Sequence, residues 1–174
     1  MRKSMIAVAL TAVVVLAAAT GAGAANAPSP SYQVAGLATF TPQGTALSFF
    51  GLATGSAGDR GLWRTSVTTA PLTGCSSLGS SCAITGGTFG LNSNNGSQLT
   101  GAVTSGSVTL TAQAPGCGRQ QFTVGGVAAT AAGGVVFSVV LTQFRLSFRG
   151  TCIAFPGSTV AGTVTVNPSA LPPG

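Results

Sequence analysis

The sequence contains no histidine and almost no acidic residues. Asp59 is the only carboxylic side chain among its 174 residues. Glycoside hydrolysis by paired carboxylates needs two such groups, and Ser–His–Asp or Cys–His catalysis needs a histidine base. The only lysine, Lys3, lies at the N-terminus, which excludes a Ser–Lys pair from the rest of the chain. Catalytic metals and calcium would lack their usual ligands. We therefore predict a protein that is not an enzyme and holds no metal or cofactor.

Positive charge is also sparse. Beyond the first three residues the basic residues are five arginines, and five positive charges less that of one aspartate leave a net charge of +4. Nucleic-acid-binding proteins usually cluster lysine and arginine with aromatic residues that stack on bases. The arginines here are spread along the chain, so we expect no nucleic-acid partner. They are Arg60, Arg64, Arg119, Arg145 and Arg149.

The N-terminal segment has the three-part layout of a secretory signal peptide. Arg2 and Lys3 precede an apolar run over residues 5–19, and the sequence AGA at 22–24 fits an A-x-A cleavage pattern. The run is short for a membrane span, which needs about 20 residues. We therefore expect a mature chain outside the cell or in the cell envelope, without a transmembrane span. The predicted organisation is a signal peptide (1–24), a linker (25–31), one all-β domain (32–167) and a disordered Pro-rich tail (168–174).

Four cysteines follow the signal, and an even number in an exported chain indicates disulfide bonds. Three pairings are possible. We favour Cys75–Cys82, which closes the short loop CSSLGSSC, together with Cys117–Cys152, which joins distant segments. A zinc site is the alternative, but the chain has no histidine and no CxxC pair.

Alternation of apolar and polar residues predicts strands along the whole domain. In SVTLTAQ (107–113) and TVAGTVTVN (159–167), apolar residues alternate with serine or threonine, and Gly, Pro and Asn mark turns between such segments. We predict a single antiparallel β-barrel of about 8–10 strands, with a two-sheet β-sandwich as the alternative. An outer-membrane barrel is disfavoured because one Trp and one Tyr cannot form two aromatic girdles.

The segment from residue 135 to residue 149 contains neither Gly nor Pro and predicts one long strand. Its apolar residues change sides. Val135, Phe137, Val139 and Leu141 share one face at odd positions, whereas Phe144, Leu146 and Phe148 share the other at even positions. We expect a bulge near 141–143 that bends the strand and lets both sets face the core. Arg145 and Arg149 would then share the opposite face, which either meets solvent or lines a cavity.

These features predict a secreted, non-catalytic β domain that binds an apolar ligand, a glycan or an anionic ligand, including an envelope polymer. Arg145 and Arg149 are candidate partners for an anionic group, because guanidinium groups suit carboxylate and phosphate. Trp63 and Tyr32 are further candidate ligand-binding residues, although Trp63 also fits an ordinary core position. The alternative function is a structural or self-associating envelope protein, because the strands carry few charges to prevent edge-to-edge association.

Overall fold

The computed structural model describes residues 29–40 and 45–167, and eight strands account for most of them. Each strand pairs antiparallel with its neighbour in sequence, and β8 pairs with β1, so the sheet closes. The predicted antiparallel β-barrel is therefore confirmed. The predicted signal peptide and tail lie outside the described residues. The strands are β1 (Ser31–Phe40), β2 (Ala46–Gly55), β3 (Arg60–Thr69), β4 (Ser81–Ser93), β5 (Gln98–Gln113), β6 (Arg119–Thr130), β7 (Gly133–Phe148) and β8 (Thr151–Asn167).

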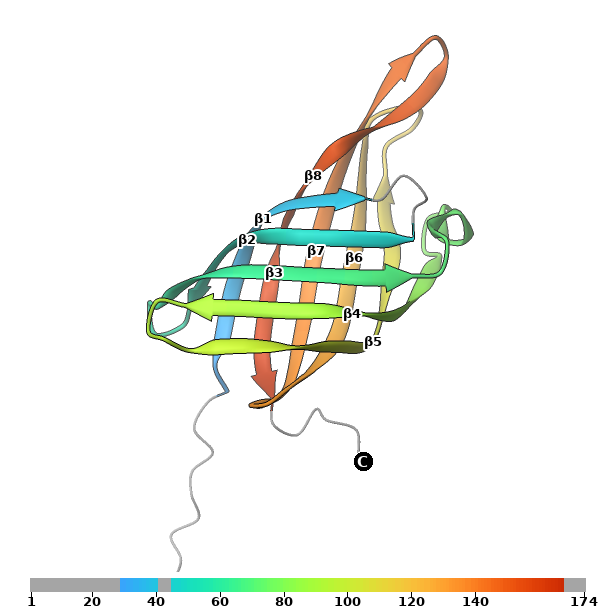
Figure 1. Cartoon of the computed structure of the whole chain (residues 1–174). Coiled ribbons are helices and arrows are strands. Elements are labelled where there is room, and N and C mark those ends of the chain that lie inside the picture. The colour runs from blue at the N-terminus through green and yellow to red at the C-terminus, as the bar shows by residue number, and fades with distance from the viewer. Residues whose placement is uncertain (1–28, 41–44, 168–174) are drawn as a thin grey trace, which may run out of the picture.

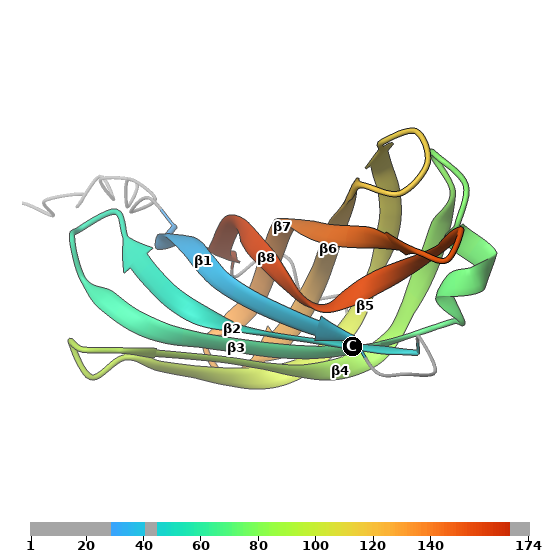
Figure 2. The same ribbon diagram turned by 90° about the horizontal axis from the view of Figure 1, so that it is seen from above.

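The barrel is flattened into two walls whose strands cross at a steep angle. In Figure 1, β2 to β5 run across the front and β6 to β8 rise steeply behind them, and Figure 2 shows the two layers from above. The pairing register shifts within the pairs β3–β4, β5–β6 and β7–β8. Such bulges bend a strand and increase its twist, which allows one continuous sheet to turn from one wall into the other.

Apolar side chains fill the interior of the barrel. Buried residues alternate with exposed ones along the strands, as expected for a wall with one inner face. The Trp63 indole stacks on Phe49 with 5.8 Å between ring centroids, and Phe89 stacks on Phe137 at 6.4 Å. Nε1 of Trp63 donates a 2.8 Å hydrogen bond to the Thr65 hydroxyl, which satisfies its polar group. Other fully buried side chains are Leu47, Leu91, Leu110 and Leu141.

Two glycines face each other where β1 and β2 approach closely. Gly36 pairs with Gly51, and a Cβ atom at either position would lie 2.1 Å from a carbonyl oxygen of the neighbouring strand. Gly51 also pairs with Trp63 on β3. The two glycines therefore permit this close backbone approach and place no side chain beside the indole.

Strand β7 continues past the end of the barrel interior. Its odd-numbered residues from Val135 to Gln143 are buried, but the register with β8 then shifts. Gln143 pairs with Ser158, whereas Arg145 pairs with Ala154, so a step of two residues on β7 matches a step of four on β8. The extra residues therefore lie in β8, and the bulge predicted in β7 at 141–143 is wrong.

Alternation along β7 consequently continues without a change of side. Phe144, Leu146 and Phe148 lie on the outer face and are 52%, 57% and 59% exposed, so the prediction that they join the core is also wrong. The physical reason is that the interior ends at a layer of buried polar residues, including Gln143 and Ser158, beyond which there is no core to enter.

Both disulfide bonds favoured from the sequence are formed. Cys75, the last residue of the short 3-10 helix η1 (Leu72–Cys75), bonds to Cys82, with 5.5 Å between Cα atoms. Cys117, in the β5–β6 loop, bonds to Cys152 near the start of β8, with 5.3 Å between Cα atoms. Two disulfides fit an extracellular location.

Candidate functional site

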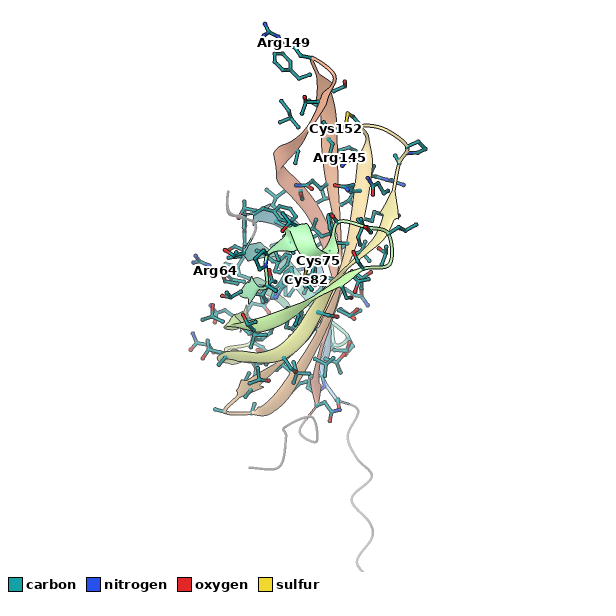
Figure 3. The ribbon with its side chains drawn as sticks, turned by 90° about the vertical axis from the view of Figure 1, so that its right-hand side faces the viewer. Arg64, Cys75, Cys82, Arg145, Arg149 and Cys152 are labelled. Atoms are coloured by element: carbon teal, nitrogen blue, oxygen red, sulfur yellow. A yellow bond between two sulfur atoms is a disulfide. The ribbon has the colours of Figure 1, made fainter. Side chains whose placement is uncertain are left out.

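The β7–β8 hairpin projects beyond the end of the barrel (Figures 1 and 3). Residues 145–148 of β7 pair with residues 151–154 of β8, and Arg149-Gly150 form the two-residue turn. Both turn residues have positive φ, 50° for Arg149 and 78° for Gly150, as a type I′ hairpin turn requires. Arginine is uncommon in this conformation, which favours glycine or asparagine. The turn thus presents an arginine at the tip, where Figure 3 shows it.

One face of the hairpin is held against the β5–β6 loop. Cys152 on this face forms the disulfide with Cys117. Nη2 of Arg145 donates a 2.7 Å hydrogen bond to the carbonyl oxygen of Gly116, and the backbone N–H of Arg145 donates to that of Gly118 at 2.9 Å. The guanidinium of Arg145 therefore helps to hold the loop and is only partly accessible.

The opposite face of the hairpin is apolar and uncovered. Leu146 pairs directly with Ile153, so both side chains point to the same side as Phe144 and Phe148. We call these four residues the hairpin apolar face. They are 50% to 59% exposed, and together they form the largest group of exposed apolar side chains outside β1–β3 among the described residues.

Two arginines flank the hairpin apolar face. Arg119 pairs with Phe144 across β6 and β7, so its exposed side chain lies on the same outer side. The guanidinium of Arg149 lies 5.5 Å from the centre of the Phe148 ring, a cation–π geometry. The only acidic residue, Asp59, lies near the start of β1. The start of β1 pairs with the last residues of β8, at the end of the barrel away from the hairpin (Figure 1). The hairpin end of the barrel is therefore both apolar and positively charged.

Tyr32 lies in a polar cluster at that other end. It is 5% exposed, and its hydroxyl group bonds to Asp59. Oδ2 of Asp59 also accepts hydrogen bonds from the hydroxyl of Ser93 at 3.0 Å and from Nδ2 of Asn95 at 3.5 Å. Burial raises the pKa of Tyr32, and the negative charge and hydrogen bond of Asp59 add to the increase. Asp59 thereby links the start of β1, the β2–β3 turn and the β4–β5 turn.

A cavity of about 370 Å³ lies beside this cluster, lined partly by Ser31, Ser56 and Ser97. Asp59 uses most of its hydrogen-bonding capacity within the protein, where it holds neighbouring turns together. We call this group of residues the clasp at the barrel end. The sequence gives no sign of this cluster, because Ser93 and Asn95 are distant from Asp59 along the chain.

The four residues predicted to bind a ligand do not converge. Arg145 and Arg149 lie on the hairpin, Tyr32 lies at the other end of the barrel, and the Trp63 side chain lies inside it, 1% exposed. Among the described residues, no three His, Cys, Asp or Glu side chains gather where they could hold a metal ion. In the same part of the chain, no helix is long and apolar enough to cross a membrane.

Sequence reasoning missed a second group of surface residues on the outer side of β2 and β3. Phe50, Leu52, Leu62 and Arg64 surround a shallow depression of about 300 Å³. Their alternation with buried residues was visible in the sequence, but the cross-strand register that brings them together was not. Comparison of the chain with protein-family models, curated proteins and solved structures gives no match.

Proposed function

We propose that the protein is a secreted, non-catalytic domain that attaches to the surface of anionic lipid layers through the tip of the β7–β8 hairpin. The hairpin apolar face carries this proposal, since four large apolar side chains remain about half exposed on a projecting segment. Clusters of this kind mark surfaces that bind membranes, proteins or ligands. Insertion of the tip would remove these side chains from water without rearrangement of the barrel.

The charges around the hairpin apolar face support an anionic partner. Arg119 and Arg149 border it, and within the described residues neither side chain has a carboxylate partner. Each arginine near an anionic lipid surface contributes about 1 kcal/mol, equivalent to about fivefold in affinity. Arginine next to aromatic residues also suits the boundary between headgroups and acyl chains, where Phe148 and Arg149 would lie.

The barrel interior offers less support for binding an apolar ligand. Trp63, Phe49 and Phe137 are at most 1% exposed and occupy the centre of the barrel together with fully buried leucines and valines. A ligand would have to displace this packing. Binding on the outer surface requires no such displacement.

Flotation of the purified, oxidised protein with lipid vesicles tests the proposal. We expect the protein to float with phosphatidylglycerol vesicles and to remain mostly unbound with phosphatidylcholine vesicles. Added salt should weaken binding, because exposed charges are screened. Absence of flotation with both vesicle types would refute the proposal.

Matched variants distinguish binding through the hairpin from non-specific adsorption to the vesicles. The double variant Leu146→Ser/Phe148→Ser should lose flotation, whereas Leu78→Ser, which removes a 66% exposed leucine from the β3–β4 connection, should not. Arg149→Asn should weaken binding about fivefold, because asparagine tolerates the positive φ but carries no charge. Arg60→Gln, at the other end of the barrel, is the control for loss of one charge. Equal effects of the two arginine variants would contradict the assigned orientation.

Light scattering on the same proteins tests self-association, the other function predicted from the sequence. Oligomers that grow with concentration and disappear in Leu146→Ser/Phe148→Ser would indicate that the hairpin binds other copies of the chain, and the lipid proposal would then be wrong. A monomer at all concentrations, together with flotation, is the result we expect.

A further inference from the structure

The depression on the outer wall is built from two adjacent pairs of residues on β2 and β3. Phe50 pairs with Arg64, and Leu52 pairs with Leu62, so these four side chains stand outward from the wall. Between the two pairs, Gly51 lies opposite Trp63, whose side chain points into the barrel. Only backbone therefore forms the floor. We call this feature the β2–β3 cup.

Three of the four side chains that surround the cup are apolar and accessible to solvent. Leu52 and Leu62 are 67% and 64% exposed, and Phe50 is 48% exposed. On β1, Leu37 pairs with Phe50 and extends the apolar surface by one strand. Because these side chains remain exposed, they contribute little to the stability of the fold. An aliphatic chain lying across the cup would remove them from water.

The fourth wall of the cup supplies an unpaired positive charge. Arg64 is exposed, and among the described residues its guanidinium has neither an ion pair nor a hydrogen bond. Figure 3 shows it on the side of the barrel, well away from Arg145 and Arg149 on the hairpin. A guanidinium beside an apolar cavity favours a ligand with a carboxylate head and an aliphatic tail.

We infer that the β2–β3 cup binds a single amphipathic carboxylate, with its aliphatic chain between Phe50, Leu52 and Leu62 and its head paired with Arg64. A volume of about 300 Å³ lies at the lower end of the range of small-molecule sites, which suits one short chain. This site goes beyond the proposed attachment of the hairpin, because it takes an individual molecule rather than an extended surface.

Charge argues against a second copy of the chain as the occupant. A partner copy could offer only Asp59 as an acidic side chain, and that carboxylate is already bound by Tyr32, Ser93 and Asn95. Two copies meeting at this wall under twofold symmetry would instead bring two Arg64 side chains near each other, without an acid between them. A small anion leaves no such repulsion.

NMR titration of the full, oxidised protein with decanoate below its micelle concentration tests the inference, with leucine methyl groups as probes. We expect saturable shifts at Leu52 and Leu62 and no shift at Leu78. Decyltrimethylammonium, which has the same chain and the opposite charge, should bind at least about fivefold more weakly. Shifts of equal size at all three leucines, or none at the cup, would overturn the inference.

Variants test whether Arg64 binds the carboxylate head group. They also distinguish binding in the cup from binding at the hairpin. Arg64→Gln should weaken decanoate binding about fivefold and leave binding of decyltrimethylammonium no weaker. Arg60→Gln, also exposed and on the same strand, is the matched control and should bind decanoate normally. Leu146→Ser/Phe148→Ser should also bind normally, because its changes affect only the hairpin. Loss of binding in that variant, or shifts at Leu52 that depend on protein concentration without ligand, would contradict a ligand site in the cup.

Discussion

Removal of the two disulfides one at a time should destabilise the protein by different amounts. Cys75 and Cys82 are 7 residues apart, whereas Cys117 and Cys152 are 35 residues apart. A cross-link stabilises the folded protein mainly by restricting the unfolded chain, and the effect grows with the logarithm of the loop length. The loop lengths give about 2.4 kcal/mol for the short loop and about 3.8 kcal/mol for the long one.

Denaturation with guanidinium chloride measures this difference directly. Trp63 is the only tryptophan and is buried against Phe49, so its fluorescence reports the unfolding of the barrel core. We expect the Cys117→Ala/Cys152→Ala variant to lose about 1.4 kcal/mol more unfolding free energy than Cys75→Ala/Cys82→Ala. A larger loss in the short-loop variant would refute the loop-entropy reasoning, and the cost would then have to lie in packing around the buried Cys75 and Cys82.

The long-loop bond also has a local role that the short-loop bond does not share. Cys152 fixes one face of the hairpin to the β5–β6 loop, next to the hydrogen bonds from Arg145 to Gly116 and Gly118. Without the disulfide, amide hydrogen exchange should accelerate over residues 145–154 by more than the global loss of stability explains. Exchange in this segment that follows only global unfolding would show that the bond does not restrain the hairpin.

Further predictions concern the interior and the clasp at the barrel end. Trp63→Ala should lower the unfolding free energy by about 3–5 kcal/mol in chemical denaturation, because it removes a stacked, hydrogen-bonded core residue. Gly51→Ala should cost about 3 kcal/mol or more, since its Cβ would lie 2.1 Å from a carbonyl oxygen, whereas Gly90→Ala meets nothing closer than 3.7 Å and is the control. Tyr32 is the only tyrosine, so ultraviolet absorbance should show its phenol ionising above its ordinary pKa of about 10. Because the folded pKa is raised, its contribution to stability should be complete below pH about 10 and be lost as the pH rises through the folded value, and Tyr32→Phe should remove this dependence.

The all-β barrel and its disulfides were predictable because their signals are local or countable. Alternation in segments such as 107–113 shows which side chains share a face, whatever their partners. Four cysteines allow only three complete pairing patterns, and the short spacing of Cys75 and Cys82 favours one of them.

The position of the bulge was not predictable from the strand that changes its pattern. The sequence of β7 shows a change of apolar parity, but the register depends equally on β8, which supplies the extra residues. Burial also depends on where the barrel ends, which is set by all eight strands together. Phe144, Leu146 and Phe148 therefore had the pattern expected of core residues, although they lie beyond the end of the barrel interior.

Contacts between distant segments were hidden for the same reason. Ser93 and Asn95 are 34 and 36 residues away from Asp59 in the sequence. They contact Asp59 only because the β2–β3 and β4–β5 turns lie at the same end of the barrel. Leu52 and Leu62 come together in the cup only through the β2–β3 register. Both candidate sites thus depend on pairing, which alternation within a single strand does not determine.

The outer faces of β5 and of the end of β7 differ in composition. The exposed positions of β5 carry small or polar residues, such as Thr100, Thr104 and Thr111. At the same kind of position, the end of β7 carries Phe144 and Leu146. These side chains stay about half exposed and add little to folding, while they increase the risk of aggregation. They would benefit the chain if another surface covers them, and the flanking arginines favour an anionic surface as the partner we propose.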